Sequence, residues 1–543
     1  MAFLLVGCGA NGAGNTTDGT GGATDGTGGL SGATGGSHGS GGAAAGSGGR
    51  AGSGGGVGTG GGGLAASGGA VGSGGTVASG GSIGTGGSLG AGTGGAGGRP
   101  ASGGASAGGR GAAAGTGGAA GATTGSGSGG AMGAGGGGSG TTCGGGTAKA
   151  GDVTVNLADL HQKISGFGVS TAWGSTMSAA DADLLWSTTT GAGLSLHRVR
   201  IDYQTGQTSE LAIAKLAVAH GVTVWATPWT PPAADKTGNT GANGEVEGTL
   251  SNGQAFGTFL AGFVSYMKGQ GVNIYAVSAQ NEPDAKVTYE SCVYTAASLA
   301  SFIGSYMGPA LAASGVKIVG PETQNWCGFA AYKSAILNDT NAAKYTTIIA
   351  THEYGCSPAA YPEIQQAGKE FWETEIYDQG SKTGDPSIAS GLRVAKLIHD
   401  AMTIASMNAW HYWWVYSNAN DNGALWDMPS NKPSKRLWVE GNFSRFVRPG
   451  FQRVGTTGTA PGGVLVSAYT KAADGTVAIV AINNNTTATP LSLFISGSAP
   501  CSLTPWATSA TDNLASKTAV PVAGSRVAVT LGAQSVTTFV GRP

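Results

Sequence analysis

Residues 272–283 read VNIYAVSAQNEP, an apolar run with a polar ending. β-Branched and aromatic residues fill the run, and Pro283 cannot donate a hydrogen bond to a sheet ladder, so the pattern predicts a buried strand that stops at the proline. Glu282 follows this strand directly. A second stretch, EFWETE at residues 370–375, has the same plan of a short apolar strand with glutamates at its end.

The second stretch offers two candidate carboxyl groups. Because successive side chains of a strand point to opposite faces, Glu373 and Glu375 are expected on the same side of it. Alternation therefore leaves the choice between these two glutamates open. Two carboxyl groups presented from different strands, with Glu282 as one of them, can together cleave a glycosidic bond.

The chain between residues 164 and 450 alternates strand patterns with helix patterns. Apolar residues between Phe256 and Met267, for example, recur at helical spacing and form one stripe that can pack against a sheet. Eight such repeats in about 280 residues favour a closed parallel (β/α)8 barrel, with an open doubly wound sheet as the alternative. In the barrel, Glu282 ends the fourth strand and Glu375 the seventh, where such barrels build their active sites. The expected strands are Ile164–Val169, Leu196–Ile201, Val222–Thr227, Ile274–Ala279, Val316–Val319, Thr346–Ala350, Glu370–Trp372 and Ala409–Val415.

Two kinds of sequence flank the barrel. Residues 151–160 and 451–543 contain short runs of alternating apolar and polar residues, which predict an antiparallel β-sandwich beside the barrel. Residues 9–148 are dominated by Gly, Ser, Ala and Thr. A segment without apolar bulk cannot offset the entropy lost on ordering, so this one is predicted to be a disordered linker. The expected fold class is therefore α/β, a barrel with a side sandwich behind a long disordered segment.

Composition narrows the range of partners. The net charge is −1 and charged residues make up only 10% of the chain, without a run of Lys or Arg, which argues against nucleic acid as a partner. The 12 tryptophans of this weakly charged chain fit a neutral polysaccharide whose sugar faces stack on aromatic rings. No Cys/His spacing predicts a metal site, and no cofactor is expected. His352 and His411 are isolated in sequence and are interpreted as hydrogen-bonded structural residues.

The N-terminus and the cysteines bear on location. Residues 1–8 look like the end of a bacterial lipoprotein signal in which Cys8 is lipidated, although the basic start and the full apolar core of such a signal are missing. We therefore expect an extracellular or cell-surface monomer that is attached to a membrane through Cys8. Exported proteins keep disulfides, and the pairing stays open among the remaining cysteines, which are Cys143, Cys292, Cys327, Cys356 and Cys501.

Several strings along the chain carry a resemblance to a known family. Over nearly all of residues 151–541 the chain resembles glycoside hydrolase family 30, most of all its bacterial endo-β-1,4-xylanase (glucuronoxylanase) branch. The resemblance implies a (β/α)8 barrel with a β-sandwich at its side, and a retaining endo-β-1,4-xylanase that cleaves xylan by double displacement. The strings are ISGFG (164–168), PWTPP (228–232), YAVSAQNEPD (275–284), ILND (336–339), THEYG (351–355), FWETEIY (371–377), WW (413–414), FSRFVRPG (443–450) and QSVTTF (534–539).

The resemblance implies roles residue by residue. The family's nucleophile is the glutamate of a Trp-x-Thr-Glu string, which selects Glu375, and its acid/base is the glutamate of Asn-Glu-Pro, which is Glu282. Asn281 matches an amide that hydrogen-bonds the 2-hydroxyl of the sugar under attack. Arg198 matches an arginine that holds Glu375 ionised. The remaining matches are tyrosines near the nucleophile and aromatic walls of the cleft, namely Tyr354, Tyr377, Trp173, Trp229 and Trp414.

The chain departs from the family's pattern at three positions. Tyr289 stands where the xylanases carry a tryptophan. Asn418 replaces an arginine that contacts the glucuronic acid branch of xylan, and Gly380 replaces a serine that also contacts this branch. Because asparagine cannot form a charged bidentate pair with a carboxylate, we expect an activity that does not depend on glucuronate branches.

Two other functions stay open from the sequence. A β-1,6-galactanase or an exo-acting β-glycosidase would use the same glutamates with different loops over residues 284–294 and 418–426. A surface-tethered protein that binds polysaccharide without cleaving it is the alternative from a different class. The presence of both Glu282 and Glu375 argues against this last alternative.

Overall fold

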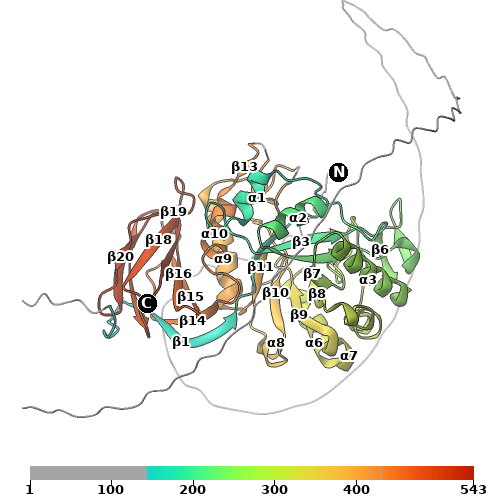
Figure 1. The fold of residues 1–543 in the computed structure, drawn as a ribbon, viewed down its shortest axis with the longest axis horizontal. Coiled ribbons are helices and arrows are strands. Elements are labelled where there is room, and N and C mark those ends of the chain that lie inside the picture. The colour runs from blue at the N-terminus through green and yellow to red at the C-terminus, as the bar shows by residue number, and fades with distance from the viewer. Residues whose placement is uncertain (1–142, 418, 429) are drawn as a thin grey trace, which may run out of the picture. The chain divides into compact units, whose positions relative to one another are not determined.

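The computed structural model describes residues 143–417, 419–428 and 430–543. This part of the chain contains a closed barrel and a separate sheet domain (Figure 1). The expected lipidation at Cys8, the expected linker up to residue 142 and the side chain of Asn418 lie outside the described residues.

Eight parallel strands close into the predicted barrel, and all eight strands expected from the sequence are present. They are β2 (Gly166–Ser170), β3 (Leu196–Ile201), β4 (Thr223–Pro228), β7 (Ile274–Ser278), β8 (Lys317–Thr323), β9 (Thr346–Thr351), β10 (Glu370–Glu373) and β11 (Ala409–Trp414). The last strand, β11, pairs with the first, β2, so the ring is complete and has no free edge. The carboxyl ends of all eight strands therefore open to one mouth.

Bulky apolar side chains fill the inside of the barrel. Trp225 of β4 and Trp372 of β10 are fully buried and meet edge to face, with ring centroids 5.8 Å apart. They are the largest side chains of the apolar cluster that fills the interior of this eight-stranded barrel. The interior cluster consists of Leu196, Trp225, Ala276, Val319, Ile348, Ala350, Trp372 and Ala409.

Helices cover the outside of the barrel. They are α1 (Ala179–Trp186), α2 (Leu211–Ala219), α3 (Gly253–Gly269), α4 (Ala296–Phe302), α5 (Gly308–Leu311), α6 (Trp326–Asn338), α7 (Thr340–Tyr345), α8 (Pro362–Gln366), α9 (Ile388–Thr403) and α10 (Lys435–Ser444). Polar caps fix where several of them begin: Asn252 accepts a first-turn backbone N–H of α3, and Ser387 does so for α9. None of the helices in the described part of the chain is long and apolar enough to cross a bilayer.

Two short hairpins that the sequence did not predict lie among the barrel loops. The first consists of β5 (Lys236–Thr240) and β6 (Val246–Leu250) and follows β4. A bridge between Val246 and Glu290 ties it to the loop that follows β7. The second consists of β12 (Trp426–Asp427) and β13 (Lys432–Pro433). The first hairpin thus builds up the barrel mouth between the strands β4 and β7.

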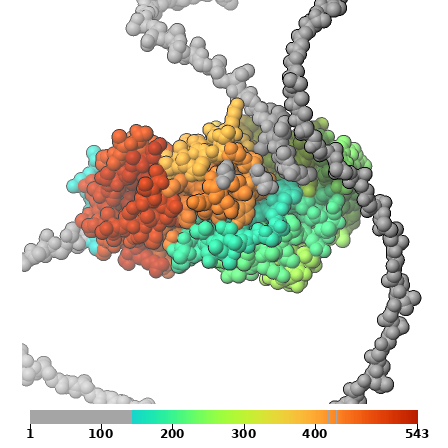
Figure 2. Space-filling model, turned by 90° about the horizontal axis from the view of Figure 1, so that it is seen from above, coloured from blue at the N-terminus to red at the C-terminus, as the bar shows by residue number. Residues whose placement is uncertain are grey.

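The sheet domain combines one strand that precedes the barrel with strands that follow it. The strands are β1 (Val153–Lys163), β14 (Gln452–Thr457), β15 (Val464–Lys471), β16 (Thr476–Asn483), β17 (Thr489–Ser496), β18 (Ser502–Thr508), β19 (Ala515–Ser516), β20 (Val520–Pro521), β21 (Arg526–Leu531) and β22 (Ser535–Gly541). Their order is β19-β18-β22-β16-β15-β14-β1-β17-β21, with β20 on β18. Inward apolar residues from both ends of this order share one core, and Figure 2 shows the late strands, in red, gathered in one body.

The prediction of a purely antiparallel sheet domain was wrong at one ladder. β1 runs parallel to β17, with Val153 opposite Leu493 and Val155 opposite Ile495, while it runs antiparallel to β14 on its other side. No hairpin connects β1 to either neighbour, because the whole barrel lies between them in sequence. Its direction was therefore not set by a turn that the sequence could reveal.

Direct contacts join the barrel helices to the sheet domain. The Asn442 amide in α10 donates to the Trp506 carbonyl at 2.9 Å and to Thr538 Oγ1 at 3.2 Å, and Thr538 Oγ1 donates back to the Asn442 carbonyl at 2.6 Å. Two disulfides answer the question left open by the sequence: Cys143 pairs with Cys501, and Cys327 pairs with Cys356. Cys292 is buried and free.

Candidate active site

Glu282 and Glu375 meet at the mouth of the barrel. Glu282 lies in the loop that follows β7, the fourth strand of the ring, and Glu375 lies two residues beyond the end of β10, the seventh. One carboxylate oxygen of each lies within 4.8 Å of the other, and both side chains are almost completely buried. Two carboxyl groups at this separation can act on the same bond of one ligand.

Two donors hold the Glu375 carboxylate. Arg198 Nη1 donates to Oε2 at 2.5 Å, and the Tyr354 hydroxyl donates to Oε1 at 3.0 Å. Burial raises the pKa of Glu375 above its usual range, and the cations His352 and Arg198 act against burial, while the carboxyl of Glu282 adds to it. The arginine and the histidine are thus the groups that favour the charged form of this carboxyl.

The terminal nitrogens of the Arg198 guanidinium, in β3, contact three side chains. Besides Glu375, Arg198 donates through Nη2 to the Asn281 amide oxygen at 2.6 Å and forms an ion pair with Glu322 Oε1 at 2.7 Å. Its Nε donates to Thr227 Oγ1 at 3.1 Å, and its guanidinium lies 4.5 Å from the centre of the Trp229 ring. Asn281, Glu375 and the cleft wall are therefore positioned by one buried cation.

The Glu282 carboxyl has different partners. The Tyr289 hydroxyl donates to Oε2 at 2.5 Å, and His352 Nδ1 lies 3.2 Å from Oε1. The backbone of Glu282 has φ +46°, a left-handed conformation that is uncommon outside glycine and occurs at functional sites. Its N–H donates to the carbonyl of Glu322 at 3.0 Å. The turn after β7 thus places the Glu282 carboxyl in the mouth of the barrel.

His352 lies at the centre of three carboxyl groups. Its Nδ1 faces Glu282, while Nε2 lies 3.6 Å from Glu322 Oε1 and 3.9 Å from Glu375 Oε2. Burial by itself lowers the pKa of an imidazole, but Glu375, Glu282 and Glu322 together outweigh burial and raise the pKa of His352 to about 10. The interpretation of His352 as a structural residue thus left out its place between the two candidate carboxyl groups.

Glu373 and Glu375 have separate surroundings, contrary to the expectation that they share a face. β10 ends at Glu373, so strand alternation does not continue to Glu375. Glu373 Oε1 accepts the backbone N–H of Glu375 at 2.6 Å, and its Oε2 accepts the backbone N–H of His411 at 2.8 Å. Glu373 therefore fixes the backbone that carries Glu375 and connects it to the neighbouring strand β11.

Aromatic side chains line the mouth beside these carboxyl groups. Trp173 packs 5.0 Å from Trp229 and edge to face against Trp414 at 6.0 Å, and Trp413 stacks on Trp414 at 4.6 Å. Trp173, Trp413 and Trp414 are partly exposed, whereas Trp229 is buried. The three exposed indoles offer faces on which a sugar ring can stack.

The structure brings together all the described residues that the sequence nominated. Tyr377 packs 5.5 Å from Tyr354, which reaches Glu375, and Tyr289 contacts Glu282. Sequence reasoning missed Glu322, His352 and Trp413. His352 and Trp413 stand in the strings THEYG and WW that were already singled out, and Glu322 follows a predicted strand in the sequence GPET, as Glu282 does in QNEP.

Glu282, His352 and Glu375 also have the residue types of a metal site, with ligand atoms within 4.8 Å of one another. The surrounding charges do not favour a cation there. Arg198 already donates to Glu375 Oε2 at 2.5 Å, so a metal ion at this oxygen would lie next to a second buried positive charge.

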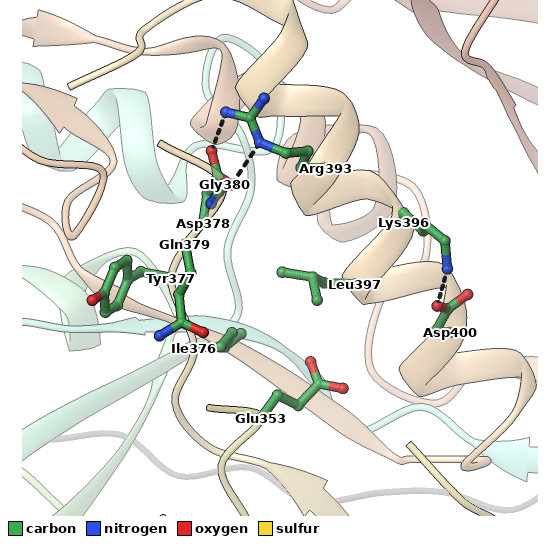
Figure 3. Close-up of a pocket in the computed structure, with 10 residues that line it drawn as sticks. All are labelled: Glu353, Ile376, Tyr377, Asp378, Gln379, Gly380, Arg393, Lys396, Leu397 and Asp400. Carbon is green, nitrogen blue, oxygen red and sulfur yellow. Dashed lines mark hydrogen bonds and ion pairs between the residues drawn. The ribbon is translucent and has the colours of Figure 1, made fainter. Parts of the chain in front are cut away.

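A side pocket of about 310 Å³ lies between α9 and the loop that follows Glu375 (Figure 3). Arg393 of α9 donates to both oxygens of Asp378 at 2.7 Å and to Asp385 at 2.9 Å. A Cβ atom at Gly380 would lie 2.4 Å from Arg393 Nε. The guanidinium therefore fills the space that a side chain at position 380 would need.

Comparisons with known proteins fit this geometry. Residues 198–425 match the family model described as the glycosyl hydrolase family 30 TIM-barrel domain. The chain is 33% identical to glucuronoxylanase XynC of Bacillus subtilis over 406 residues, which is 72% of this chain and 92% of that protein. Among solved structures, it is similar to the family 30 subfamily 8 xylanase Xyn30A of Clostridium acetobutylicum, with 38% identity, a TM-score of 0.65 and coverage of 73% and 100%. A family 30 endoxylanase of Clostridium papyrosolvens matches at 32% identity with a TM-score of 0.64, over 72% and 100% of the two chains.

Proposed function

The chain belongs to glycoside hydrolase family 30, and on that premise we propose that it is a retaining endo-β-1,4-xylanase. One observation carries the proposal: a carboxylate oxygen of Glu282 and one of Glu375 lie within 4.8 Å of each other at the barrel mouth. Retaining glycosidases hold their two carboxyl groups about 5 to 5.5 Å apart, whereas inverting enzymes need room for a water molecule between them. The similar xylanases supply the choice of polymer.

In the first step, Glu375 attacks the anomeric carbon while Glu282 protonates the departing glycosidic oxygen. Arg198 and Tyr354 hold the attacking carboxylate, so its orientation is set before the substrate arrives. Asn281, oriented by Arg198, is placed to bind the 2-hydroxyl of the sugar under attack. A covalent glycosyl ester on Glu375 results, and the polymer fragment leaves with the proton from Glu282.

In the second step, Glu282 removes a proton from water, which attacks the same carbon and releases the sugar with its original configuration. Tyr289 and His352 contact the two oxygens of Glu282 and fix its orientation for both proton transfers. His352 Nε2 also lies 3.9 Å from Glu375 Oε2, so the positive charge of this imidazole lies close to both carboxyl groups. These assignments give Glu282 the acid/base role and Glu375 the nucleophile role.

The same proposal includes activity on xylan without glucuronate branches. Asn418 cannot supply the bidentate cation that would select a uronate. The arginine that lies against position 380 is Arg393, which donates to Asp378 (Figure 3). It also donates to Asp385. An arginine committed to two carboxylates offers little attraction to a third one. The altered positions 380 and 418 thus support recognition of the polymer backbone alone.

Product analysis on linear xylan, glucuronate-branched xylan and purified linear xylooligosaccharides tests the proposal. We expect oligosaccharide products from all three substrates and similar kcat/KM values for the two polymers. Release of monomer alone would assign an exo-acting enzyme, and cleavage of β-1,6-galactan instead of xylan would assign a galactanase. A preference of about a hundredfold or more for glucuronoxylan would contradict the branch-independent part.

The Glu375→Gln variant is the matched control for this experiment. It should lose activity by about 10⁴-fold or more while still binding the polymer, because only the attacking carboxylate is removed. Unchanged turnover would overturn the assignment of Glu375, and equal binding without turnover in the wild type would favour a non-catalytic binding protein.

We also propose that the protein works outside the cytoplasm. The disulfides Cys143–Cys501 and Cys327–Cys356 support this location, because disulfides persist in oxidising compartments. Attachment through Cys8 remains the proposed anchor. Labelling of whole cells with a radioactive fatty acid, with Cys8→Ser as the control, tests it.

A further inference from the structure

Glu322 is a third glutamate at the barrel mouth, near the end of β8. Its side chain is completely buried, and its Oε1 pairs with Arg198 Nη2 at 2.7 Å. Thr227 Oγ1 lies 3.3 Å from Glu322 Oε2 and donates to it. The backbone carbonyl of Glu322 accepts the N–H of Glu282 at 3.0 Å. One residue thus contacts both the arginine that holds Glu375 and the peptide group that carries Glu282.

The backbone of Glu322 has φ +60°, which places it in the left-handed region. A non-glycine residue in this region is strained and persists where the surrounding structure requires it. Glu282, the partner of its carbonyl, has the same kind of backbone at φ +46°. Two left-handed glutamates, one in the loop after β7 and one near the end of β8, are joined by a backbone hydrogen bond, which indicates that this corner of the mouth is shaped for the site rather than for strand geometry.

We propose that the carboxylate of Glu322 is a positioning group for the reaction: it fixes Arg198 between Asn281 and Glu375, while the backbone carbonyl of the same residue holds the turn that presents Glu282. This role rests on the proposed function. Glu322 is fully buried behind Arg198, so it acts through other residues and not through substrate contact.

The chemistry of the ion pair explains why an anion is needed behind Arg198. If Glu375 were the only anion beside Arg198, the guanidinium would pair with Glu375 most strongly. It could then move with the Glu375 carboxylate when this group attacks the sugar. With Glu322 on Nη2 and Glu375 on Nη1, the cation is shared between two carboxylates and is held by a partner other than Glu375. The nucleophile can then leave the ion pair as its charge is lost to the new bond, while Arg198 stays in place.

Titratable groups from several strands act on Glu322. Arg198 from β3 and His352 after β9 bring positive charge, and both also contact Glu375. His411 from β11 also lies nearby, but burial lowers its pKa to about 3, so it is neutral. Burial alone would raise the pKa of Glu322, but Arg198 and His352 hold it below its usual value. Glu322 in turn helps to keep His352 protonated. Removing its charge should therefore be visible at His352 as well as in turnover.

The Glu322→Gln variant tests the proposal, because glutamine keeps the shape and removes the charge. Since a hydrogen bond to a charged group is lost, we expect kcat on linear xylan to fall between about 10- and 150-fold. KM should stay within about threefold, because no substrate contact is removed. By NMR titration of labelled imidazoles, His352 should lose its proton at a lower pH than in the wild type.

The matched control is Glu440→Gln, a change of an equally buried carboxyl in α10 that lies outside the site. It should leave kcat and the titration of His352 unchanged. Glu322→Asp keeps the negative charge, but its side chain is one methylene group shorter, so the carboxylate lies farther from Arg198. The kcat of this variant should lie between those of the wild type and Glu322→Gln. This aspartate variant also carries the test if the glutamine variant does not fold: full wild-type kcat with an unchanged His352 titration would then overturn the proposal.

Different results would contradict the proposed xylanase function and the proposed role of Glu322. A wild-type protein that cleaves no xylan overturns the proposed function. An active wild type whose Glu322→Gln variant keeps kcat within about twofold overturns only the positioning role of Glu322.

Discussion

At the scale of single residues, Arg198 is the side chain on which the charges of the site converge. Its guanidinium contacts Glu375, Glu322 and Asn281 and lies over the Trp229 ring. Lysine could not replace it, because one ammonium group cannot meet three acceptors in a fixed plane. Together with His352, it provides the positive charge that favours the ionised form of the buried Glu375 carboxyl, as the proposed nucleophile role requires.

Arg198→Lys should therefore change the pH dependence of the enzyme. In the proposed mechanism Glu375 must be ionised to attack, burial raises its pKa, and Arg198 opposes that effect. Weakening the arginine contact raises this pKa further, so the acidic limb of the kcat/KM profile on xylan should move to higher pH. We also expect kcat/KM at the optimum to fall between about 10- and 150-fold. An acidic limb at the wild-type position would contradict this account.

Arg436→Lys is the control for that experiment. Arg436 is as deeply buried as Arg198, but it donates to the carbonyls of Ala424 and Asp385 and not to a carboxyl of the site. The control should lose thermal stability and keep the wild-type pH profile.

At the scale of elements, the loops after β8 and β9 are joined to each other next to the site. Cys327 is the second residue of α6, and Cys356 lies two residues beyond Tyr354, whose hydroxyl donates to Glu375. The backbone N–H of Trp326 also donates to the carbonyl of Gly355 at 3.1 Å. The disulfide thus restrains the short loop on which Tyr354 is carried.

Replacing both Cys327 and Cys356 by serine should reduce stability and turnover together. Opening a loop of 29 residues removes a stabilisation of about 3–4 kcal/mol in the chain-entropy description. If Tyr354 loses its fixed position, kcat should fall by about tenfold. The double serine variant at Cys143 and Cys501 should lower the unfolding temperature but leave kcat unchanged, and equal effects of the two variants on kcat would argue against a role for the Cys327–Cys356 link.

The same scale shows what the sequence could and could not predict. The eight barrel strands followed from apolar runs that stop at polar residues, because each run is buried on both faces. The hairpin of β5 and β6 has polar, half-exposed strands, so no apolar pattern marked it. The parallel pairing of β1 with β17 depends on segments more than 300 residues apart. Local patterns do not record which distant strand a given strand will meet.

The candidate site was predictable for a related reason. Glu282 and Glu375 end predicted strands, and the order of strands in a barrel brings such ends together. Glu322 was missed although it also lies at a strand end, because its partner Arg198 and the left-handed backbone are visible only in three dimensions. His352 looked isolated since its three acidic neighbours come from three other strands.

At the scale of the whole molecule, α10 connects the barrel with the sheet domain. Asn442 is fully buried in this helix and makes hydrogen bonds to Trp506 in β18 and Thr538 in β22. The sheet domain contains the strand before the barrel and the strands after it, and α10 adds direct contacts between the two domains. We therefore expect the barrel and the sheet domain to unfold as one cooperative unit.

Asn442→Ala should lower the free energy of unfolding by about 1–3 kcal/mol, because the Trp506 carbonyl and the Thr538 hydroxyl lose a buried donor. Denaturant unfolding followed by circular dichroism and by tryptophan fluorescence should still give coincident transitions. Asn484→Ala removes an exposed amide within the sheet domain and should change stability by less than about 0.5 kcal/mol. Two separate transitions in the wild type would show that the contacts of α10 do not couple the domains.

The position of β1 ahead of the barrel has a consequence for the growing chain. On the ribosome, β1 is complete about 290 residues before its partner β14 begins. At about 5–20 residues per second, the strand waits roughly 15–60 s without a neighbour. Its ladder with β14 is irregular between Asn156 and Leu160 and again before Lys163, so the final pairing of β1 is not that of a long regular strand. We therefore expect β1 to offer other chains a poorer edge for pairing than a regular strand would during the interval in which its barrel is being made.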